Sequence, residues 1–197
     1  MDLTGMFGEG WAITLAHHRL GTALHHMGVP DPRTLPDAFN QAAYHAQNGD
    51  LDDGVLLLGR TLPDGWSLIL ELDGRTGWTG IASEVLTGLS ADGNTAFTAC
   101  RTPDDLDMYI AHDGAEIAEL DLVSAAFPQG ADTTHPLIAA LTAVGFDASD
   151  DLTPTGEAAE DHDDMGLALA IRALTGLNLT THDLTPPFIG GFTHIRP

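Results

Sequence analysis

The chain has 197 residues, of which 43% are hydrophobic, so it can bury a substantial core and is not a disordered acidic tail. Aspartate and glutamate number 29 against seven arginines, no lysine is present, and the formal net charge is −22. A field this negative repels nucleic acid and anionic membranes, and a chain without lysine has no P-loop for nucleotide phosphates. The composition therefore predicts no nucleic-acid partner and no membrane association.

The charge has three interpretations, which we rank in the order given. The first is a soluble protein from a high-GC or salt-adapted host whose proteins favour aspartate over lysine, since 22 of the acidic residues are aspartate and lysine is absent. The second is a surface that binds a basic protein partner. The third is mimicry of DNA. Net charge bears on solubility and on the steering of partners rather than on fold.

Cys100 is the single cysteine, which excludes an intrachain disulfide and a cysteine metal cluster. It ends an apolar run, so we expect a buried and unreactive thiol. The first ten residues, MDLTGMFGEG, lack the basic and apolar regions of a signal peptide, and the longest apolar runs are far too short to span a membrane. We therefore expect a cytoplasmic protein.

The first predicted elements lie in residues 11–47. Residues 11–27 fit either one amphipathic helix or a short buried strand over 11–16 followed by a helix that begins near His18. We prefer the strand followed by the helix, which Gly28 and Pro30 end in either case. A second helix is predicted over 36–47, with a proline in its first turn.

A block of strands follows. Alternating apolar residues separated by turn signals predict strands over 55–60, 66–72, 94–100, 107–112 and 115–122.

Two local signals lie within this block. A short helix is predicted over 83–90, with Ser83 as its N-cap. Asp113 and Gly114 suit the two-residue turn of a hairpin, flanked by His112 and Ala115, because glycine accepts a positive φ at little cost. The hairpin register then places Ile110 opposite Ile117 and Met108 opposite Glu119.

The C-terminal part is predicted to be mostly helical. A helix over 135–145 ends at a glycine, and a long polar surface loop follows it. The next helix, over 165–176, should bury Leu167, Ile171 and Leu174. The tail after residue 180 is expected to contain a short helix and irregular chain.

The sequence EDHDD at 160–164 is the densest group of potential metal ligands or acid–base groups. Ligands on one continuous segment fan outward, whereas a metal site needs side chains that converge from separate elements. Carboxylates before an apolar helical stripe instead cap free N–H groups and oppose the positive end of the helix dipole. We therefore expect no metal here and a helix that begins within about two residues of Asp163.

The histidine-rich stretch 17–26 is a second candidate. In a helix, His18 and His25 are about 10 Å apart along the axis, which is too far for one ion. The acidic stretches 50–54 and 102–107 do not match a calcium loop, and GxSxG is absent. We predict no catalytic residue, no metal ligand and no cofactor. A hydrolase site formed only in three dimensions remains open, and its candidates are His17, His45, His112, Asp161 and His162.

Residues 50–122 contain the pattern DGW followed by a glutamate and a turn glycine, and then EVLTGLS. Together with IRALTGLNLT in 165–185, this block resembles a family of uncharacterised actinobacterial proteins. The resemblance implies no catalytic residues, and Trp66, Glu71 and Gly74 are motif positions of unknown role. On physical grounds we expect Trp66 in the core and Glu71 on the opposite face of its strand, exposed or paired with an arginine such as Arg75.

Together these features predict one α+β domain over 1–197. It comprises an N-terminal strand and helix region (1–50), a sheet (51–122) and a helical part (123–197). The sheet should be mainly antiparallel and meander-like, with helices packed on one face. The expected function is the binding of another protein through acidic surface, in a regulatory or immunity-like role without catalysis. An Asp/His hydrolase and a DNA mimic are the alternatives.

Overall fold

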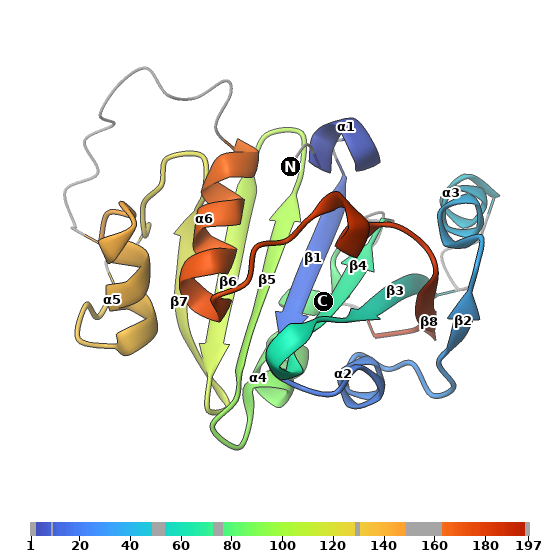
Figure 1. Ribbon diagram of the computed structural model, residues 1–197, viewed down its shortest axis with the longest axis horizontal. Helices are drawn as coiled ribbons and strands as arrows, with labels where there is room; N and C mark the ends of the chain where they lie inside the picture. Colours follow the sequence, from blue (N-terminus) through green and yellow to red (C-terminus); the bar gives the residue numbers. More distant parts are fainter. Residues whose placement is uncertain are drawn as a thin grey trace.

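The computed structural model describes residues 3–8, 10–48, 54–72, 77–128, 131–148 and 163–195. Its centre is an eight-stranded sheet in the order β2-β8-β3-β4-β1-β5-β6-β7, and all neighbouring strands pair antiparallel (Figure 1). The predicted α+β class with an antiparallel sheet is therefore confirmed. The strands are β1 (Trp11–Ala16), β2 (Arg33–Leu35), β3 (Val55–Thr61), β4 (Ser67–Glu71), β5 (Thr95–Arg101), β6 (Leu106–His112), β7 (Ala115–Asp121) and β8 (Phe188–Thr193).

The sheet combines a meander with strands from both ends of the chain. Strands β5, β6 and β7 follow one another as predicted, and β1 lies between β4 and β5. Strands β2 and β8 were not predicted. The first has only three residues, and the second contains Gly190 and Gly191, which are unfavourable in most strands. Gly190 is required because a Cβ at this position would collide with the carbonyl oxygen of Leu57 on β3.

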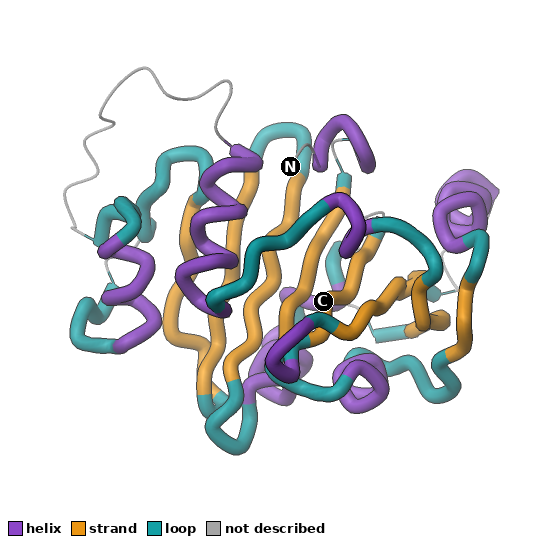
Figure 2. Tube along the Cα trace, viewed as in Figure 1, coloured by secondary structure: helices purple, strands orange, loops and turns teal. Residues whose placement is uncertain are grey.

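Helices cover both faces of the sheet rather than the one face expected (Figure 2). We call the face under α6 the front and the face under α2 and α4 the back. The reason is that central strands such as VLLLG and SLILE are apolar on both sides, which is typical of strands buried on both faces. The front carries α1 (Leu3–Phe7), α3 (Ala38–Asn48), α5 (Pro136–Ala143), α6 (Asp163–Thr175) and η4 (Thr181–Leu184). The back carries α2 (Leu20–His26), α4 (Ser83–Ser90) and η3 (Thr79–Ile81), and η2 (Pro63–Gly65) joins β3 to β4.

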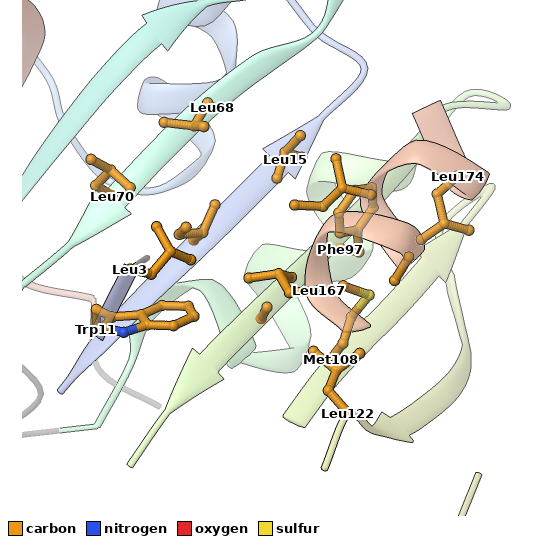
Figure 3. Close-up of a cluster of buried hydrophobic side chains, with 14 of the residues drawn as sticks. Leu3, Trp11, Leu15, Leu68, Leu70, Phe97, Met108, Leu122, Leu167 and Leu174 are labelled. Carbon is orange, nitrogen blue, oxygen red and sulfur yellow. The ribbon is translucent and has the colours of Figure 1, made fainter. Parts of the chain in front are cut away.

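The front core is the larger of the two. Leu167 and Leu174 of α6 lie over Phe97 of β5 and Met108 of β6 (Figure 3). The predicted stripe of Leu167, Ile171 and Leu174 is buried, so the periodicity of this helix was interpreted correctly. No described helix is long and apolar enough to cross a membrane.

Helix starts follow the local signals with two exceptions. The predicted helix over 36–47 begins at Ala38, so Pro36 precedes its first turn instead of lying in it. The strand-then-helix interpretation of residues 11–27 is confirmed, and α6 begins at Asp163, although 160–162 lie outside the described residues. Ser83 is the first residue of α4 and not its N-cap. That position belongs to Ala82, whose side chain offers no acceptor.

The β6–β7 hairpin has the predicted turn but a different register. His112 pairs with Ala115, and Asp113 and Gly114 both have positive φ, 50° and 77°, as a type I′ turn requires. A β-bulge beside Ile110 then shifts the pairing, so Ile110 faces Ala118 and Met108 faces Leu120. The bulge keeps Leu120 in the core and moves Glu119 to the back face, whereas the predicted register would bury Glu119 against Met108.

Candidate functional site

The back face of the sheet carries two neighbouring rows of polar side chains. Because strand residues alternate between faces, the pairing register places each row across adjacent strands. The first row, across β4, β1, β5, β6 and β7, is Glu71, Ala12, Cys100, Asp107 and Asp121. The second row, across β1, β5, β6 and β7, is Thr14, Thr98, Tyr109 and Glu119.

Glu71 lies at the buried end of the first row. Its carboxylate accepts hydrogen bonds from the backbone N–H groups of Thr79 (2.7 Å) and Gly80 (2.9 Å), both in η3. Glu71 does face away from Trp66, which is in the front core as expected. It is fully buried, however, so its predicted exposure was wrong. Gly74 and the proposed partner Arg75 lie outside the described residues.

Two opposing effects determine the protonation state of Glu71. Burial raises the pKa of its carboxyl group to about 7, and the hydrogen bonds from Gly80 and Thr79 lower it only in part. Burial is the larger effect because it removes the carboxylate from water, and no cation contributes to the shift. Glu71 therefore changes charge close to neutral pH.

A threonine pair fixes the same loop from the other side. The hydroxyl groups of Thr14 and Thr98 are 2.9 Å apart, and Thr98 donates to the carbonyl oxygen of Gly80 at 2.9 Å. Gly80 has no room for a side chain, because a Cβ there would lie 2.7 Å from Thr98 Oγ1. The close approach lets Trp78 pack on Ala12 and cover the middle of both rows.

The other end of the rows is acidic and partly open. We call Asp105, Asp107, Tyr109, Glu119 and Asp121 the acidic surface; Asp105 and Glu119 are exposed and the others are half-buried. Burial, followed by the charges of Asp105, Asp121 and Glu119, raises the pKa of Asp107 to about 6. Burial also raises the pKa of Tyr109, as does Glu119, to which its hydroxyl donates a hydrogen bond.

Cys100 lies between Glu71 and Asp107 in the first row, and its predicted burial is confirmed. Burial, followed by the charges of Asp107 and Glu71, raises the pKa of its thiol to about 12. The thiol therefore stays protonated at neutral pH and is a poor nucleophile.

The described histidines among the hydrolase candidates lie apart. His17 contacts Trp66 (ring centroids 5.3 Å apart) and His45 contacts Phe192 (4.6 Å). His112 Nδ1 is 3.0 Å from Thr95 Oγ1, which is a hydroxyl–imidazole pair. Among the described residues no carboxylate hydrogen-bonds the ring of His112, so the pair lacks the orienting third group of a triad.

The remaining two hydrolase candidates, Asp161 and His162, lie outside the described residues. Glu160, the first residue of EDHDD, also lies outside them. In the histidine-rich stretch, the rings of His18 and His26 have centroids 5.8 Å apart. Within the described part of the chain, no group of three or more His, Cys, Asp or Glu side chains is placed to hold a metal ion.

Comparison with known proteins shows the family of the chain. The model of a family of unknown function (DUF6461) matches residues 4–186. The chain belongs to this family. The match includes the motif positions Trp66, Glu71 and Gly74, and the family's description assigns them no role. No curated protein and no solved structure matches the chain.

Sequence reasoning missed the acidic surface as a unit. Its residues come from β6, from β7 and from the turn before β6. The bulge in the β6–β7 hairpin determines that Glu119 and Asp121 share a face with Asp107. A usable signal was present, however. Asp107 and Asp121 are separated from the Asp113-Gly114 turn by the same number of paired residues, since the one extra residue on β7 is the bulge.

Proposed function

We propose that this protein binds a basic protein partner through the acidic surface, in a regulatory or immunity-like role without catalysis. The observation that carries the proposal is the pairing of Asp107 directly opposite Asp121 on adjacent strands. Like charges in this position destabilise a sheet. A lysine or arginine from a partner removes that repulsion and forms charge-assisted hydrogen bonds.

The composition of the acidic surface supports the same function. Tyr109 lies among the carboxylates and packs beside Ile81, Trp78 and Cys100. A modest apolar centre with a charged rim is the usual anatomy of a protein interface. An aromatic ring among carboxylates also suits an arginine side chain, because its guanidinium group can stack on the ring and bind a carboxylate at the same time.

The distribution of charge supports a steered encounter. Of the five arginines in the described residues, Arg19, Arg33 and Arg60 lie at or near α2, β2 and β3. Most of the exposed acidic residues in the described part of the chain lie instead around α4, β6 and β7: Glu84, Asp92, Asp104, Asp105, Asp113, Glu116 and Glu119. The other exposed ones, Asp31, Asp37, Asp64, Asp132 and Asp147, are scattered along the chain. A basic protein approaching this uneven field is oriented toward the β6–β7 end.

Affinity capture from the native host tests the proposal. The bait is the wild-type protein at low and at raised ionic strength, compared with the variant Asp105→Asn/Asp107→Asn/Glu119→Gln. We expect a protein of basic isoelectric point to bind the wild type at low salt, to dissociate at raised salt, and to be lost with the variant.

A matched control removes the same number of charges elsewhere, in Asp31→Asn/Asp64→Asn/Asp132→Asn, at three exposed positions. This control should retain the partner. Equal loss with both triple variants would show that net charge, not the acidic surface, attracts the partner. Failure to capture any partner, together with hydrolytic turnover that Thr95→Val abolishes, would favour the hydrolase alternative.

A further inference from the structure

A depression of about 560 Å³ lies at the end of the molecule away from the acidic surface. Its walls come from the start of α2 and the residues before it, the loop before β2, the end of β3, η2 and β8. This volume is within the range of small-molecule sites, roughly 300–1,000 Å³. The lining is mainly apolar, and none of the described residues that form it is acidic, although the chain has 29 acidic residues.

Arg19 is the one arginine among the described residues of this lining. Its side chain is exposed, and within the described part of the chain it makes no hydrogen bond and no ion pair. In a protein of net charge −22, an arginine without a carboxylate is unusual, because carboxylates are abundant along the chain. With respect to the described residues, the guanidinium group therefore has its donors free for a ligand.

The rest of the lining provides an apolar wall. Leu20, Pro32 and Ile189 contribute to it, and Ile189 is 43% exposed although its neighbours Phe188 and Gly190 are buried. An exposed β-branched side chain beside an unpaired arginine provides two kinds of contact in one place. A ligand with an apolar body and an anionic group can satisfy both at once.

The lining contains a single permanent charge. His18 also belongs to it, and burial, followed by the charges of His26 and His17, lowers the pKa of its ring. His18 is therefore neutral at pH 7. An adjoining depression of about 890 Å³ shares Pro32 but has Asp31 beside Arg33, so its charges offset one another.

We propose that the depression beside Arg19 binds a small organic monocarboxylate. The carboxylate forms a bidentate pair with the Arg19 guanidinium, and the aliphatic or aromatic body packs on Leu20, Pro32 and Ile189. One cation matches one negative charge, whereas a phosphate dianion carries a second charge that no other arginine of the described lining balances. The proposal is independent of the partner-binding function.

The test is a titration of ¹⁵N-labelled protein with hexanoate, 1-hexanol and inorganic phosphate, followed by ¹H–¹⁵N correlation spectra. We expect saturable shifts for the amides of residues 18–21 and 189 with hexanoate, and no saturable shift with 1-hexanol or phosphate. No saturable shift with hexanoate, or equal binding of 1-hexanol, would overturn the proposal. Binding of phosphate alone would also overturn it.

Two variants separate this site from general charge effects. Arg19→Gln should weaken hexanoate binding about tenfold or more, because a charge-assisted pair is lost. Gly21→Leu should also block binding, since Gly21 lines the depression and a Cβ there meets open space, so we expect the added side chain to occupy the ligand's place. The control Arg172→Gln, at an exposed position on α6, should leave binding unchanged. Hexanoate shifts that persist in Arg19→Gln would contradict the proposal.

Discussion

Asp107 on β6 lies directly opposite Asp121 on β7, on the face of the sheet that also carries Glu119. Asp121 is held there by its own turn, because its carboxylate accepts hydrogen bonds from the backbone N–H groups of Val123 (2.8 Å) and Ser124 (3.0 Å). It cannot swing away without losing these bonds. Burial of Asp107, followed by the charges of Asp105 and Asp121, raises the pKa of its carboxyl group to about 6.

The first prediction concerns Asp107 and pH. A folded-state pKa of about 6 exceeds the unfolded value near 4, so the folded protein binds the proton more tightly. The resulting stability is present below pH 4 and is lost as pH rises through about 6. Asp107→Asn should therefore raise the free energy of unfolding at pH 8 by about 1 kcal/mol, after allowance for solvent screening, and change it little at pH 4. Urea unfolding at the two pH values measures this difference.

The second prediction concerns Glu71. Its folded-state pKa of about 7 lies above the usual 4.5, so this residue also stabilises the protein at low pH, and the contribution is lost as pH rises from about 4.5 through 7. The contribution of this protonation to the free energy of unfolding is up to about 3 kcal/mol, because the carboxyl group is fully buried. Glu71→Gln should remove this part of the pH dependence while Asp107→Asn keeps it. An unchanged slope between pH 5 and pH 8 in Glu71→Gln would refute the raised pKa.

The third prediction concerns the β6–β7 turn. Gly114 has a φ of 77°, and a Cβ there would be 4.0 Å from the nearest atom, Ala91 Cα. No clash is involved, so a substitution tests the backbone conformation alone. Gly114→Val should destabilise the protein by about 1–2 kcal/mol, whereas Gly114→Asn should cost clearly less because asparagine tolerates positive φ. Thermal unfolding of the two variants gives the comparison, and a neutral valine would show that the turn is wrongly assigned.

The fourth prediction concerns Arg60 on β3. Its guanidinium group donates to the carbonyl oxygens of His182 (2.9 Å), Thr185 and Pro187 (3.1 Å) and lies over the ring of Phe188. Arg60→Gln should destabilise the protein by about 2 kcal/mol and speed amide exchange in η4 and β8. Arg172→Gln, which changes the charge equally, is the control. Unchanged protection of β8 in Arg60→Gln would mean that the hydrogen bonds do not hold this segment.

The fold could be predicted where the signal was local. Residues 107–121 contain alternating apolar residues and an Asp-Gly pair, so both strands and the turn were placed correctly. Strand β8 was missed because its two glycines remove the apolar pattern, and the reason for Gly190 is contact with β3, more than 100 residues away. Helices on both faces were missed because a strand sequence alone does not show what packs against each side.

The candidate site could be predicted only in part. The net charge of −22 indicated an acidic surface, and the β propensity of the region placed Asp107 and Glu119 on strands. Their common face depends on a bulge that periodicity does not reveal. The burial of Glu71 depends on a loop that returns over β4, with acceptor and donors eight and nine residues apart in the chain. No propensity rule encodes such a contact.

The most direct test of the partner-binding account is hydrogen–deuterium exchange of the protein alone and in complex with its captured partner at low ionic strength. The account predicts slower exchange confined to β6, β7 and the segment around Trp78 and Ile81, which flank the acidic surface. At raised salt the partner should dissociate, and exchange in these segments should return to the rate of the protein alone. Protection centred instead on α2 and β8, with the β6–β7 hairpin unchanged, would contradict the account.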